Sequence, residues 1–172
     1  MPSLPARASP PGKVILRFEE RPHTLLTLSQ ARLSQTPEQQ QLFARHAYPL
    51  TDELYVVLSD NPADWTPINH CCDPNAWWSG LDIVARRPIA EGEEITLEYA
   101  TFHNELMPEF VCSCPAADCR KVVRGSDYLL PFVAQYAGHV SDYVKTKRMT
   151  LAAQRVAAVG GGPPSPPPGV LR

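Results

Sequence analysis

The five cysteines constrain this chain more than any other feature of its sequence. Three of them, Cys112, Cys114 and Cys119, have the spacing C-x-C-x4-C, and the other two, Cys71 and Cys72, are adjacent. Proline and aspartate lie in the longer spacer and favour a tight turn, which lets neighbouring thiolates converge on one cation. A structural zinc ion takes four tetrahedral ligands, often all sulfur. The cluster therefore predicts a zinc site with three local ligands and a fourth from elsewhere in the fold. The candidates for the fourth ligand are Cys71, Cys72, His70 and His103.

Buried free thiols and disulfides are the alternatives for these cysteines. Free cysteine is often buried as a small hydrophobic residue, but the clustering beside turn-forming residues favours metal binding. The sequence has no apolar N-terminal stretch typical of a secretory signal, so we expect a reducing compartment and few disulfides. The expected location is intracellular, in the nucleus or cytosol. An organelle is the alternative, because residues 1–12 hold arginine and serine but no acidic residue.

Length and composition indicate one globular domain. The 172 residues match a domain of ordinary size, and a hydrophobic content of 44% is enough to bury a core. The formal net charge of −2 excludes a global basic field for nucleic acid. No apolar run approaches the roughly 18 residues that a membrane span needs. The sequence therefore gives no strong signal for a nucleic-acid or membrane partner.

Hydrophobic patterning predicts short strands in the first two thirds of the chain. Runs of β-branched and aromatic residues bounded by turn residues favour strands. These runs are residues 13–18, 53–58, 77–86 and 95–99. Residues 25–33 are ambiguous, and residues 59–64 are expected to form a loop.

Three helices are expected. Thr36, Pro37 and Gln39 form a helix start with a side-chain cap, and this helix is expected to end near residue 47. Two more are expected over residues 126–137 and 140–159, each followed by glycine.

Two polar segments precede the cysteine cluster, and each has an ordinary structural interpretation when taken alone. Residues 68–75, Ile-Asn-His-Cys-Cys-Asp-Pro-Asn, are typical of a polar turn. Residues 92–99, Gly-Glu-Glu-Ile-Thr-Leu-Glu-Tyr, are typical of a turn that enters a strand, with Tyr99 as a half-buried packing residue. Neither segment by itself demands catalysis.

In their order along the chain, these two segments and the cysteine cluster resemble the SET-domain family of protein-lysine methyltransferases. The first resembles the family's N-H-S-C-x-P-N motif, with Cys71 in place of serine. The second resembles its G-E-E-L-T-x-D-Y motif, with Ile95 for leucine and Glu98 for aspartate. The C-x-C-x4-C spacing is that of the post-SET zinc knuckle, and residues 12–15 resemble a K-G-E-V-I stretch early in such domains. The resemblance covers residues 13–125, with a weaker continuation to residue 147.

The resemblance implies an α+β fold that is mostly β: a SET-type β-clip with a pseudoknot, a zinc knuckle and C-terminal helices. It implies that the two polar segments lie side by side, that Asn69 and His70 hold S-adenosylmethionine and that Tyr99 is the catalytic tyrosine. It also implies that Cys72 is the fourth zinc ligand, which leaves Cys71 as a spare thiol.

The resemblance and the composition together divide the chain into five segments. A Pro-rich and poorly ordered lead precedes a SET domain, a post-SET zinc knuckle, C-terminal helices and a disordered Pro/Gly-rich tail. Their expected bounds are residues 1–12, 13–105, 106–125, 126–159 and 160–172.

The implied reaction explains the residue types of such a site. A lysine amine must be neutral to attack a methyl group on a sulfonium, and an apolar channel and the nearby positive charge both lower its pKa. A tyrosine hydroxyl can orient the amine, and aromatic walls attract a methylated ammonium. The expected channel residues are Tyr55, Leu97 and Phe102, with Trp65, Trp77 and Trp78 as further candidates. Each aromatic residue has plain core packing as its alternative role. Leu97 is smaller than the phenylalanine or tyrosine usual in the family, which favours multiple over single methylation.

Two departures from the family pattern affect the expected cofactor pocket. The family opens with a G-x-G turn close to the cofactor, whereas residues 1–12 contain only Gly12. The arginine–phenylalanine pair usual before Ile-Asn-His is Thr66-Pro67 here. Two interpretations remain: a pocket without its usual first part, or a truncated form of a longer protein.

The sequence therefore supports two main functional hypotheses. The first is S-adenosylmethionine-dependent methyl transfer to a lysine of a protein, with a histone tail as one candidate substrate. The second is a catalytically impaired SET-like zinc module that binds a protein partner. A nucleic-acid-binding zinc protein is a third interpretation, which the slightly acidic charge balance disfavours. The oligomeric state is not predicted.

Overall fold

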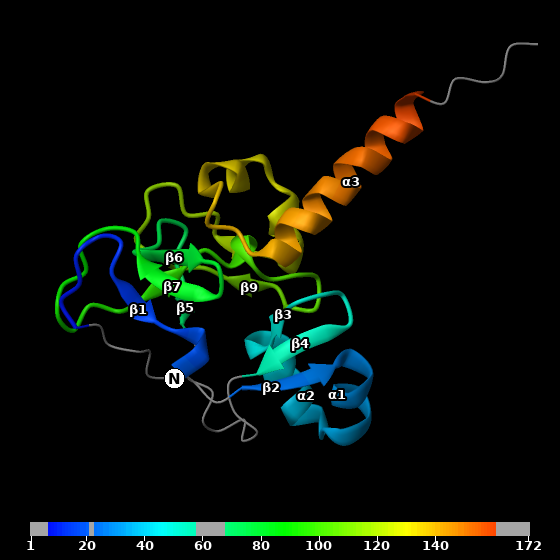
Figure 1. Ribbon diagram of the computed structural model, residues 1–172, viewed down its shortest axis with the longest axis horizontal. Helices are drawn as coiled ribbons and strands as arrows, with labels where there is room; N and C mark the ends of the chain where they lie inside the picture. Colours follow the sequence, from blue (N-terminus) through cyan, green and yellow to red (C-terminus); the bar gives the residue numbers. More distant parts are fainter. Residues whose placement is uncertain (1–6, 21–22, 58–67, 161–172) are drawn as a thin grey trace, which may run out of the picture.

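Small sheets and short helices make up the protein, which has the α+β class expected from the sequence (Figure 1). In the computed structural model of the chain, residues 7–20, 23–57 and 68–160 are described. The expected loop 59–64, Trp65 and most of the tail lie outside these residues. Among the residues that are described, no helix is both long and apolar enough to cross a membrane.

The first sheet has the strand order β1-β7-β6 and is antiparallel. Its strands are β1 (Val14–Leu16), β6 (Ala76–Ser79) and β7 (Asp82–Ala85). The prediction of one strand over residues 77–86 is wrong, because the chain reverses there and β6 pairs with β7. Gly80 makes the reversal with a φ of 62°, since glycine tolerates the left-handed conformation at the first position of a two-residue hairpin loop. N-terminal to β1, Ser9 is buried and bridges to Ile89.

The second sheet has the order β2-β4-β3 and carries two helices. The ambiguous stretch 25–33 divides into strand β2 (Thr24–Thr27) and helix α1 (Leu28–Ser34). Helix α2 (Pro37–His46) begins where the sequence predicted, with Thr36 and Gln39 capping each other's backbone. The sheet is completed by β3 (Tyr48–Pro49) and β4 (Leu54–Val57). Between β1 and β2 the chain forms a short 3₁₀ helix, η1 (Phe18–Glu20). In Figure 1 this unit and the β1-β7-β6 sheet lie on opposite sides of the molecule.

A short parallel pair joins the two polar motifs. Strand β5 (Asn69–His70) lies beside β8 (Thr96–Leu97), so the first motif is not only the polar turn that its residues suggest. The prediction of a strand over residues 95–99 is too long. The side chain of Glu98 accepts a hydrogen bond from the backbone of Ala100, and the 3₁₀ helix η3 (Tyr99–Thr101) begins at once. The turn therefore sets Tyr99 directly after the paired strand.

The cysteine cluster lies between the strands of a two-stranded antiparallel sheet. Strand β9 (Phe110–Val111) pairs with β10 (Val122–Val123). Lys121 adopts a φ of 64° where the chain leaves the cluster to enter β10. The sheet thus holds both ends of the cysteine segment.

The C-terminal region is helical, but it differs from the prediction at its start. The expected α-helix over residues 126–137 is replaced by two 3₁₀ helices, η4 (Gly125–Leu129) and η5 (Pro131–Tyr136). Pro131 causes the break, because a residue before proline avoids the helical conformation and Leu130 is extended, with a ψ of 147°. Helix α3 (Asp142–Gly160) corresponds to the predicted second helix. Its first turns are buried at Tyr143 and Val144, and its last turns extend away from the body (Figure 1).

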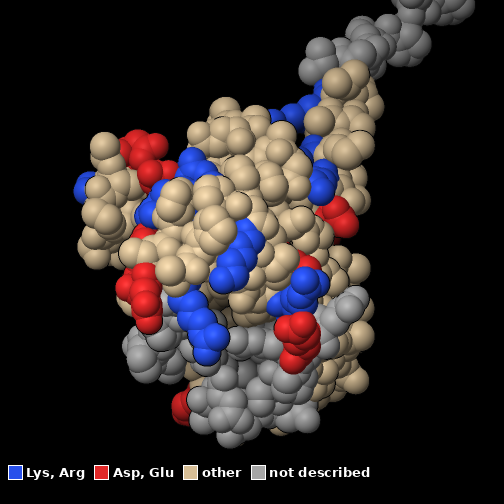
Figure 2. Space-filling model, turned by 60° about the vertical axis from the view of Figure 1, so that its left-hand side comes forward, with Lys and Arg blue, Asp and Glu red and all other residues tan. Residues whose placement is uncertain are grey.

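The surface charges are mixed on the face shown in Figure 2. Basic and acidic side chains are interspersed there. Among the described residues, ion pairs join Arg86 to Asp73 and Arg87 to Glu93, whichever face they lie on. Mixed charge of this kind disfavours a broad single-sign field on the face shown.

Among the glycines compared in the described part of the chain, Gly125 alone has backbone atoms close to the position of an added Cβ, which gives a first prediction. A Cβ atom at this position would lie 2.1 Å from the backbone oxygen of Asn104 and 2.9 Å from Cα of Glu105. Both neighbours are backbone, so we expect Gly125→Ala to lower the free energy of unfolding by about 2–3 kcal/mol through overpacking. Urea unfolding measures this loss.

Gly138→Ala is the matched control. Gly138 has a φ of 88°, and a Cβ atom added there would have no neighbour within 4 Å, so only backbone strain should matter. We expect a loss of about 1 kcal/mol there. Equal losses for the two variants would contradict the steric argument.

Candidate active site and zinc knuckle

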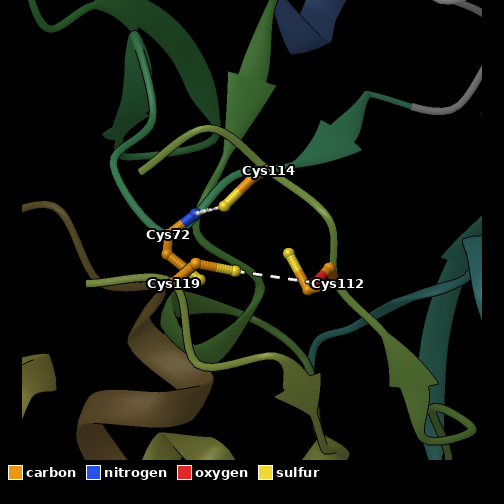
Figure 3. Close-up of side chains that lie close together, drawn as sticks. All are labelled: Cys72, Cys112, Cys114 and Cys119. Carbon is orange, nitrogen blue, oxygen red and sulfur yellow. Dashed lines mark hydrogen bonds between the residues drawn. The ribbon is translucent and has the colours of Figure 1, made fainter. Parts of the chain in front are cut away.

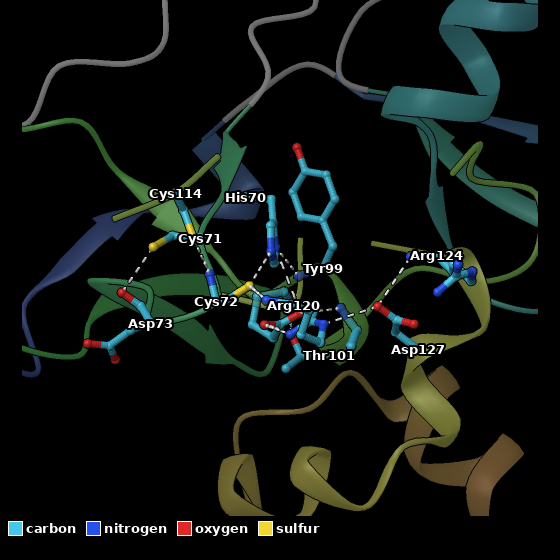
Figure 4. A network of polar contacts seen from close by, with 12 residues as sticks. His70, Cys71, Cys72, Asp73, Tyr99, Thr101, Cys114, Arg120, Arg124 and Asp127 are labelled. Atoms are coloured by element: carbon cyan, nitrogen blue, oxygen red, sulfur yellow. Dashed lines mark hydrogen bonds and ion pairs between the residues drawn. The ribbon is translucent and has the colours of Figure 1, made fainter. Parts of the chain in front are cut away.

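The β5–β8 pairing brings the two polar motifs side by side. Asn69 lies opposite Thr96, and His70 lies opposite Leu97. The backbone N–H of Tyr99 donates to Nδ1 of His70 at 3.3 Å, and the two side chains lie next to each other in Figure 4. The structure therefore brings Tyr99 beside Asn69 and His70, as the resemblance implied.

The Tyr99 hydroxyl is held in one direction. It donates to the backbone carbonyl of Ile68 at 2.9 Å. Burial, with a smaller contribution from the charge of Glu94, raises the pKa of Tyr99 to about 12. The phenol is therefore protonated at neutral pH, and its oxygen keeps lone pairs that can accept a further hydrogen bond.

A small apolar cavity of about 100 Å³ lies on one side of Tyr99. The predicted channel residues Leu97 and Phe102 both line it. Its other aromatic walls include Tyr48 and Trp78, whose rings pack against Phe102 at centroid distances of 5.6 and 5.3 Å. The cavity is thus a narrow aromatic space.

Tyr55, the third predicted channel residue, does not line this cavity. Successive residues of β4 point to opposite faces of the sheet, and Val56 takes the position towards the cavity. The ring of Tyr55 packs instead against Phe43, at 5.2 Å, and its hydroxyl accepts a hydrogen bond from Asn104. The structure therefore places Tyr55 outside this cavity, and its channel role stays a prediction.

Sequence reasoning missed Tyr48 as a cavity residue. It lies in a two-residue strand, which is too short to show any hydrophobic alternation. Of the further aromatic candidates, Trp78 lines the cavity. Trp77 points elsewhere and stacks on His139, with centroids 3.6 Å apart.

A larger and more polar pocket of about 930 Å³ is also lined by Tyr99. Asn69, His70 and Phe110 line it, together with the loop that carries the cysteines. The Asn69 amide donates to Glu94 at 2.6 Å. Pockets that hold drug-sized ligands span about 300–1,000 Å³, so this one is large enough for a cofactor.

The side chain of His70 is turned away from that pocket. It is only 2% exposed, and its Nε2 lies 3.3 Å from Sγ of Cys72. Burial, helped by the charge of Arg120, lowers the pKa of His70 to about 4, so the ring is neutral at physiological pH. Any contact between His70 and a molecule in the pocket would therefore involve its backbone.

The four cysteines expected to bind zinc converge on one point (Figure 3). The sulfur atoms of Cys72, Cys112, Cys114 and Cys119 all lie within 4.8 Å of one another. Tetrahedral Zn–S bonds of about 2.3 Å place their sulfurs about 3.8 Å apart, so a small contraction would seat the ion. The donor set therefore fits zinc.

The other candidates for the fourth ligand lie outside this group. Cys71 points its thiol to the carbonyl of Asp73, at 3.3 Å. His103 is buried and lines the small cavity. His70 contacts Cys72 but is not part of the four-sulfur cluster.

Backbone hydrogen bonds prepare one thiol of the cluster for metal binding. Burial acts to raise the pKa of Cys114, but hydrogen bonds from the backbone of Cys72 and Ala116 and from the neighbouring thiols outweigh it and lower the pKa to about 6. The Cys72 N–H lies 3.4 Å from the Cys114 sulfur. A thiolate is the form that binds metal.

A buried ion-pair network lies beneath the cluster and was not predicted from the sequence. Glu98 is 1% exposed and accepts two hydrogen bonds from the Arg120 guanidinium, at 2.7 and 2.8 Å. Arg120 also contacts Asp127 at 3.2 Å, and its backbone N–H lies 3.4 Å from Sγ of Cys72. Burial works against the charge of Arg120, but the hydrogen bonds and charge of Glu98 prevail and raise its pKa. The only sequence signal was an arginine directly after the last cysteine.

Comparison with known proteins places the fold in a family. The chain is 41% identical over 87 residues to histone-lysine N-methyltransferase trithorax of Drosophila melanogaster, and the match covers 44% of this chain and 2% of that protein. It is 36% identical over 76 residues to histone-lysine N-methyltransferase Su(var)3-9 of Drosophila pseudoobscura pseudoobscura, covering 33% of this chain and 12% of that protein. It is 25% identical over 122 residues to methyltransferase flvH of Aspergillus flavus, covering 63% of this chain and 68% of that protein.

The chain thus spans only a small part of the two histone-lysine methyltransferases that it matches. The family model described as SET domain matches residues 6–100, which is more than half of the 172 residues. The order of the motifs, the paired β5 and β8 and this match lead to one conclusion: the chain belongs to the SET-domain family.

Proposed function

We propose that this protein transfers a methyl group from S-adenosylmethionine to the side-chain amine of a lysine in a protein substrate. The observation that carries the proposal is the position of Tyr99, which lines both the large polar pocket and the small aromatic cavity. Two reactants bound in the two spaces would meet at this residue. Holding them there supplies much of the rate through positioning.

The large pocket has the chemistry that the cofactor needs. Asn69 and the backbone of His70 offer polar contacts, and Phe110 offers an apolar face. S-adenosylmethionine would supply an electrophilic methyl group on a sulfonium sulfur. These residues would bind and orient it, as the resemblance to the family implies.

The small cavity would take the lysine side chain. Its aromatic walls exclude water and favour a neutral amine over an ammonium ion. Because the Tyr99 hydroxyl donates its proton to Ile68, its oxygen is free to accept an N–H of the amine. That hydrogen bond would turn the nitrogen lone pair away from Tyr99 and towards the methyl group. With Leu97 beside it, the cavity favours more than one round of methylation.

The four clustered cysteines would hold a structural zinc ion. The ion would join the C-terminal segment 106–125, which we propose as a post-SET knuckle, to the loop that follows Asn69 and His70. It would do so through Cys72. Its task is to close the large pocket rather than to take part in the chemistry.

The substrate is proposed to be a protein that presents an accessible lysine. Two of the relatives are named histone-lysine methyltransferases, so a histone tail is the first substrate to test. A location in the nucleus or cytosol fits that substrate.

Methyl transfer from labelled S-adenosylmethionine to histones and other proteins tests the proposal. We expect transfer by the natural chain and a loss of about a hundredfold in kcat for Tyr99→Phe, by analogy with the removal of one well-placed polar group from other active sites. Tyr55→Phe is the matched control, because Tyr55 lies outside the cavity and its hydroxyl bonds Asn104. It should keep kcat within a factor of three.

Absence of transfer, or equal activity of Tyr99→Phe and the natural chain, would reject the enzymatic proposal. Calorimetry with S-adenosylmethionine then separates the alternatives. A non-catalytic SET-like module that only binds a protein partner should give no heat of binding.

A further inference from the structure

The ring of His70 lies between Tyr99 and Cys72, the residue that would tie the proposed zinc knuckle to the first motif (Figure 4). Its Nδ1 is 3.3 Å from the backbone nitrogen of Tyr99, and its Nε2 is 3.3 Å from Sγ of Cys72. The side chain is 2% exposed, so water does not compete for either contact. The imidazole therefore bridges two groups that belong to different parts of the proposed site.

The partners of the two nitrogens fix the position of the ring proton. A backbone N–H can only donate, so Nδ1 must accept from Tyr99 and carry no proton. The proton of the neutral ring is then on Nε2, which donates it to the Cys72 sulfur. Groups beyond the metal ligands commonly tune and orient those ligands by such hydrogen bonds.

We propose that His70 is a positioning residue that couples the zinc knuckle to Tyr99, by donating from Nε2 to the Cys72 thiolate and accepting at Nδ1 from the Tyr99 backbone. In this arrangement the metal-bound sulfur orients the ring, and the ring holds the start of η3. The Tyr99 hydroxyl is held at its other end by Ile68, so the residue is fixed from both sides. The consequence for methyl transfer rests on the proposed function, whereas the hydrogen bonds do not.

Two neighbouring acceptors define the competing arrangement. Glu98 Oε1 lies 3.8 Å from Nδ1, too far for a hydrogen bond, and its oxygens already accept from Arg120. The Leu97 carbonyl is the second acceptor near the ring; it accepts the Cys71 N–H at 3.1 Å and has a further lone pair, so a ring N–H donated to Leu97 is the competing arrangement. A proton on Nδ1 would oppose the Tyr99 N–H. The observed contacts therefore favour the proton on Nε2.

His70, Cys72 and Glu98 could in principle hold a metal ion of their own, because their ligand atoms also lie within 4.8 Å of one another. The bidentate contact with Arg120 already balances the charge of Glu98. Cys72 is shared with the four-sulfur group. A hydrogen-bonded bridge accounts for these contacts without a second ion.

Nitrogen-15 NMR of the unmodified, zinc-loaded protein tests the tautomer directly. We expect the His70 ring to carry its proton on Nε2. A proton on Nδ1 would overturn the proposal. This measurement needs no variant, so it holds even if substitutions at this buried position fail to fold.

Two substitutions of His70 test its two hydrogen bonds separately. The amide nitrogen of glutamine can replace Nε2, so His70→Gln keeps the donor to Cys72 and loses the acceptor for Tyr99. The amide oxygen of asparagine can replace Nδ1, so His70→Asn keeps the acceptor and loses the donor. Cobalt-loaded protein reports on the thiolate, because a lost hydrogen bond raises electron density on sulfur and shifts its charge-transfer absorption to longer wavelength. We expect this shift for His70→Asn and a nearly unchanged spectrum for His70→Gln.

Methyl transfer reports on the other half of the bridge. We expect kcat of His70→Gln to fall about tenfold, as expected for the loss of one hydrogen bond, with the KM for S-adenosylmethionine within twofold. His139→Gln is the matched control. The His139 ring contacts the Trp78 carbonyl and stacks on Trp77, so this change should alter neither the cobalt spectrum nor the metal content.

Identical spectra and kcat values for both His70 variants and the natural chain would overturn the inference. Loss of transfer already in the natural chain would instead reject the proposed function, while the NMR and cobalt spectra still decide the hydrogen bonds.

Discussion

Removal of zinc is expected to unfold the knuckle and abolish methyl transfer together. The four sulfurs come from two regions of the chain, Cys72 near the first motif and three cysteines between β9 and β10. Zinc binding to such sites contributes about 10–16 kcal/mol in peptides that fold around the ion. Even a fraction of this, about 4 kcal/mol, would lower the melting temperature by roughly 10 °C for a domain of this size. Thermal unfolding and methyl transfer, each with and without a strong chelator, measure the effect.

The two adjacent cysteines provide a matched pair of variants for this prediction. Cys72→Ser should lose the metal and reduce transfer at least tenfold, because Cys72 is part of the four-sulfur cluster. Cys71→Ser should keep one zinc ion per chain, since the Cys71 thiol contacts the Asp73 carbonyl instead. Equal zinc content in the Cys72→Ser and Cys71→Ser proteins would contradict the assignment of the fourth ligand.

Lowering the pH should also release the metal from the natural chain, because protons compete for the thiolates.

The ordered motifs were enough to predict which distant segments meet. The C-x-C-x4-C spacing predicted that three cysteines converge, and the resemblance added Cys72, whose sulfur lies within 4.8 Å of theirs. That these four residues bind zinc stays a prediction. The resemblance also placed Tyr99 beside Asn69 and His70, which the β5–β8 pairing shows. The capped start of α2 was predicted from three residues, because capping depends on neighbours in sequence. The catalytic, cofactor-binding and channel roles of these residues stay predictions.

Features that depend on packing were harder to predict. The alternation along β4 decides whether Tyr55 or Val56 faces the cavity, and a short strand does not reveal which face is buried. Tyr48 enters the cavity from a strand of two residues. Arg120 had no expected role, because its partner Glu98 is separated from it by 22 positions and lies at the end of another strand. A buried ion pair between residues far apart in the sequence can be recognised only once the fold has brought the two side chains together.

Arg120→Met is expected to destabilise the protein by about 3–5 kcal/mol, because it removes one partner from a buried ion pair. Glu98 is 1% exposed and would keep only the hydrogen bond from Ala100, while Asp127 would lose its contact with the guanidinium. The same change should reduce methyl transfer, since Glu98 precedes Tyr99 and its side chain caps η3. Urea unfolding gives the change in stability.

Two measurements show whether the loss of stability comes from the broken Glu98–Arg120 pair: its pH dependence, and the effect of replacing a second arginine, Arg124. Burial raises the pKa of Glu98, and Arg120 opposes that rise. Without Arg120 the folded protein should bind a proton at Glu98 more tightly than the unfolded chain does. The stability loss should then be largest at neutral pH and shrink as the pH falls through the raised pKa of the folded state.

Arg124→Met is the control. It removes an exposed ion pair with Glu109, so it should lower the free energy of unfolding by at most about 1 kcal/mol. It should show no comparable pH dependence. Equal losses for the two arginines at every pH would mean that the Glu98–Arg120 pair does not act as a buried clamp between the knuckle and the turn at Tyr99.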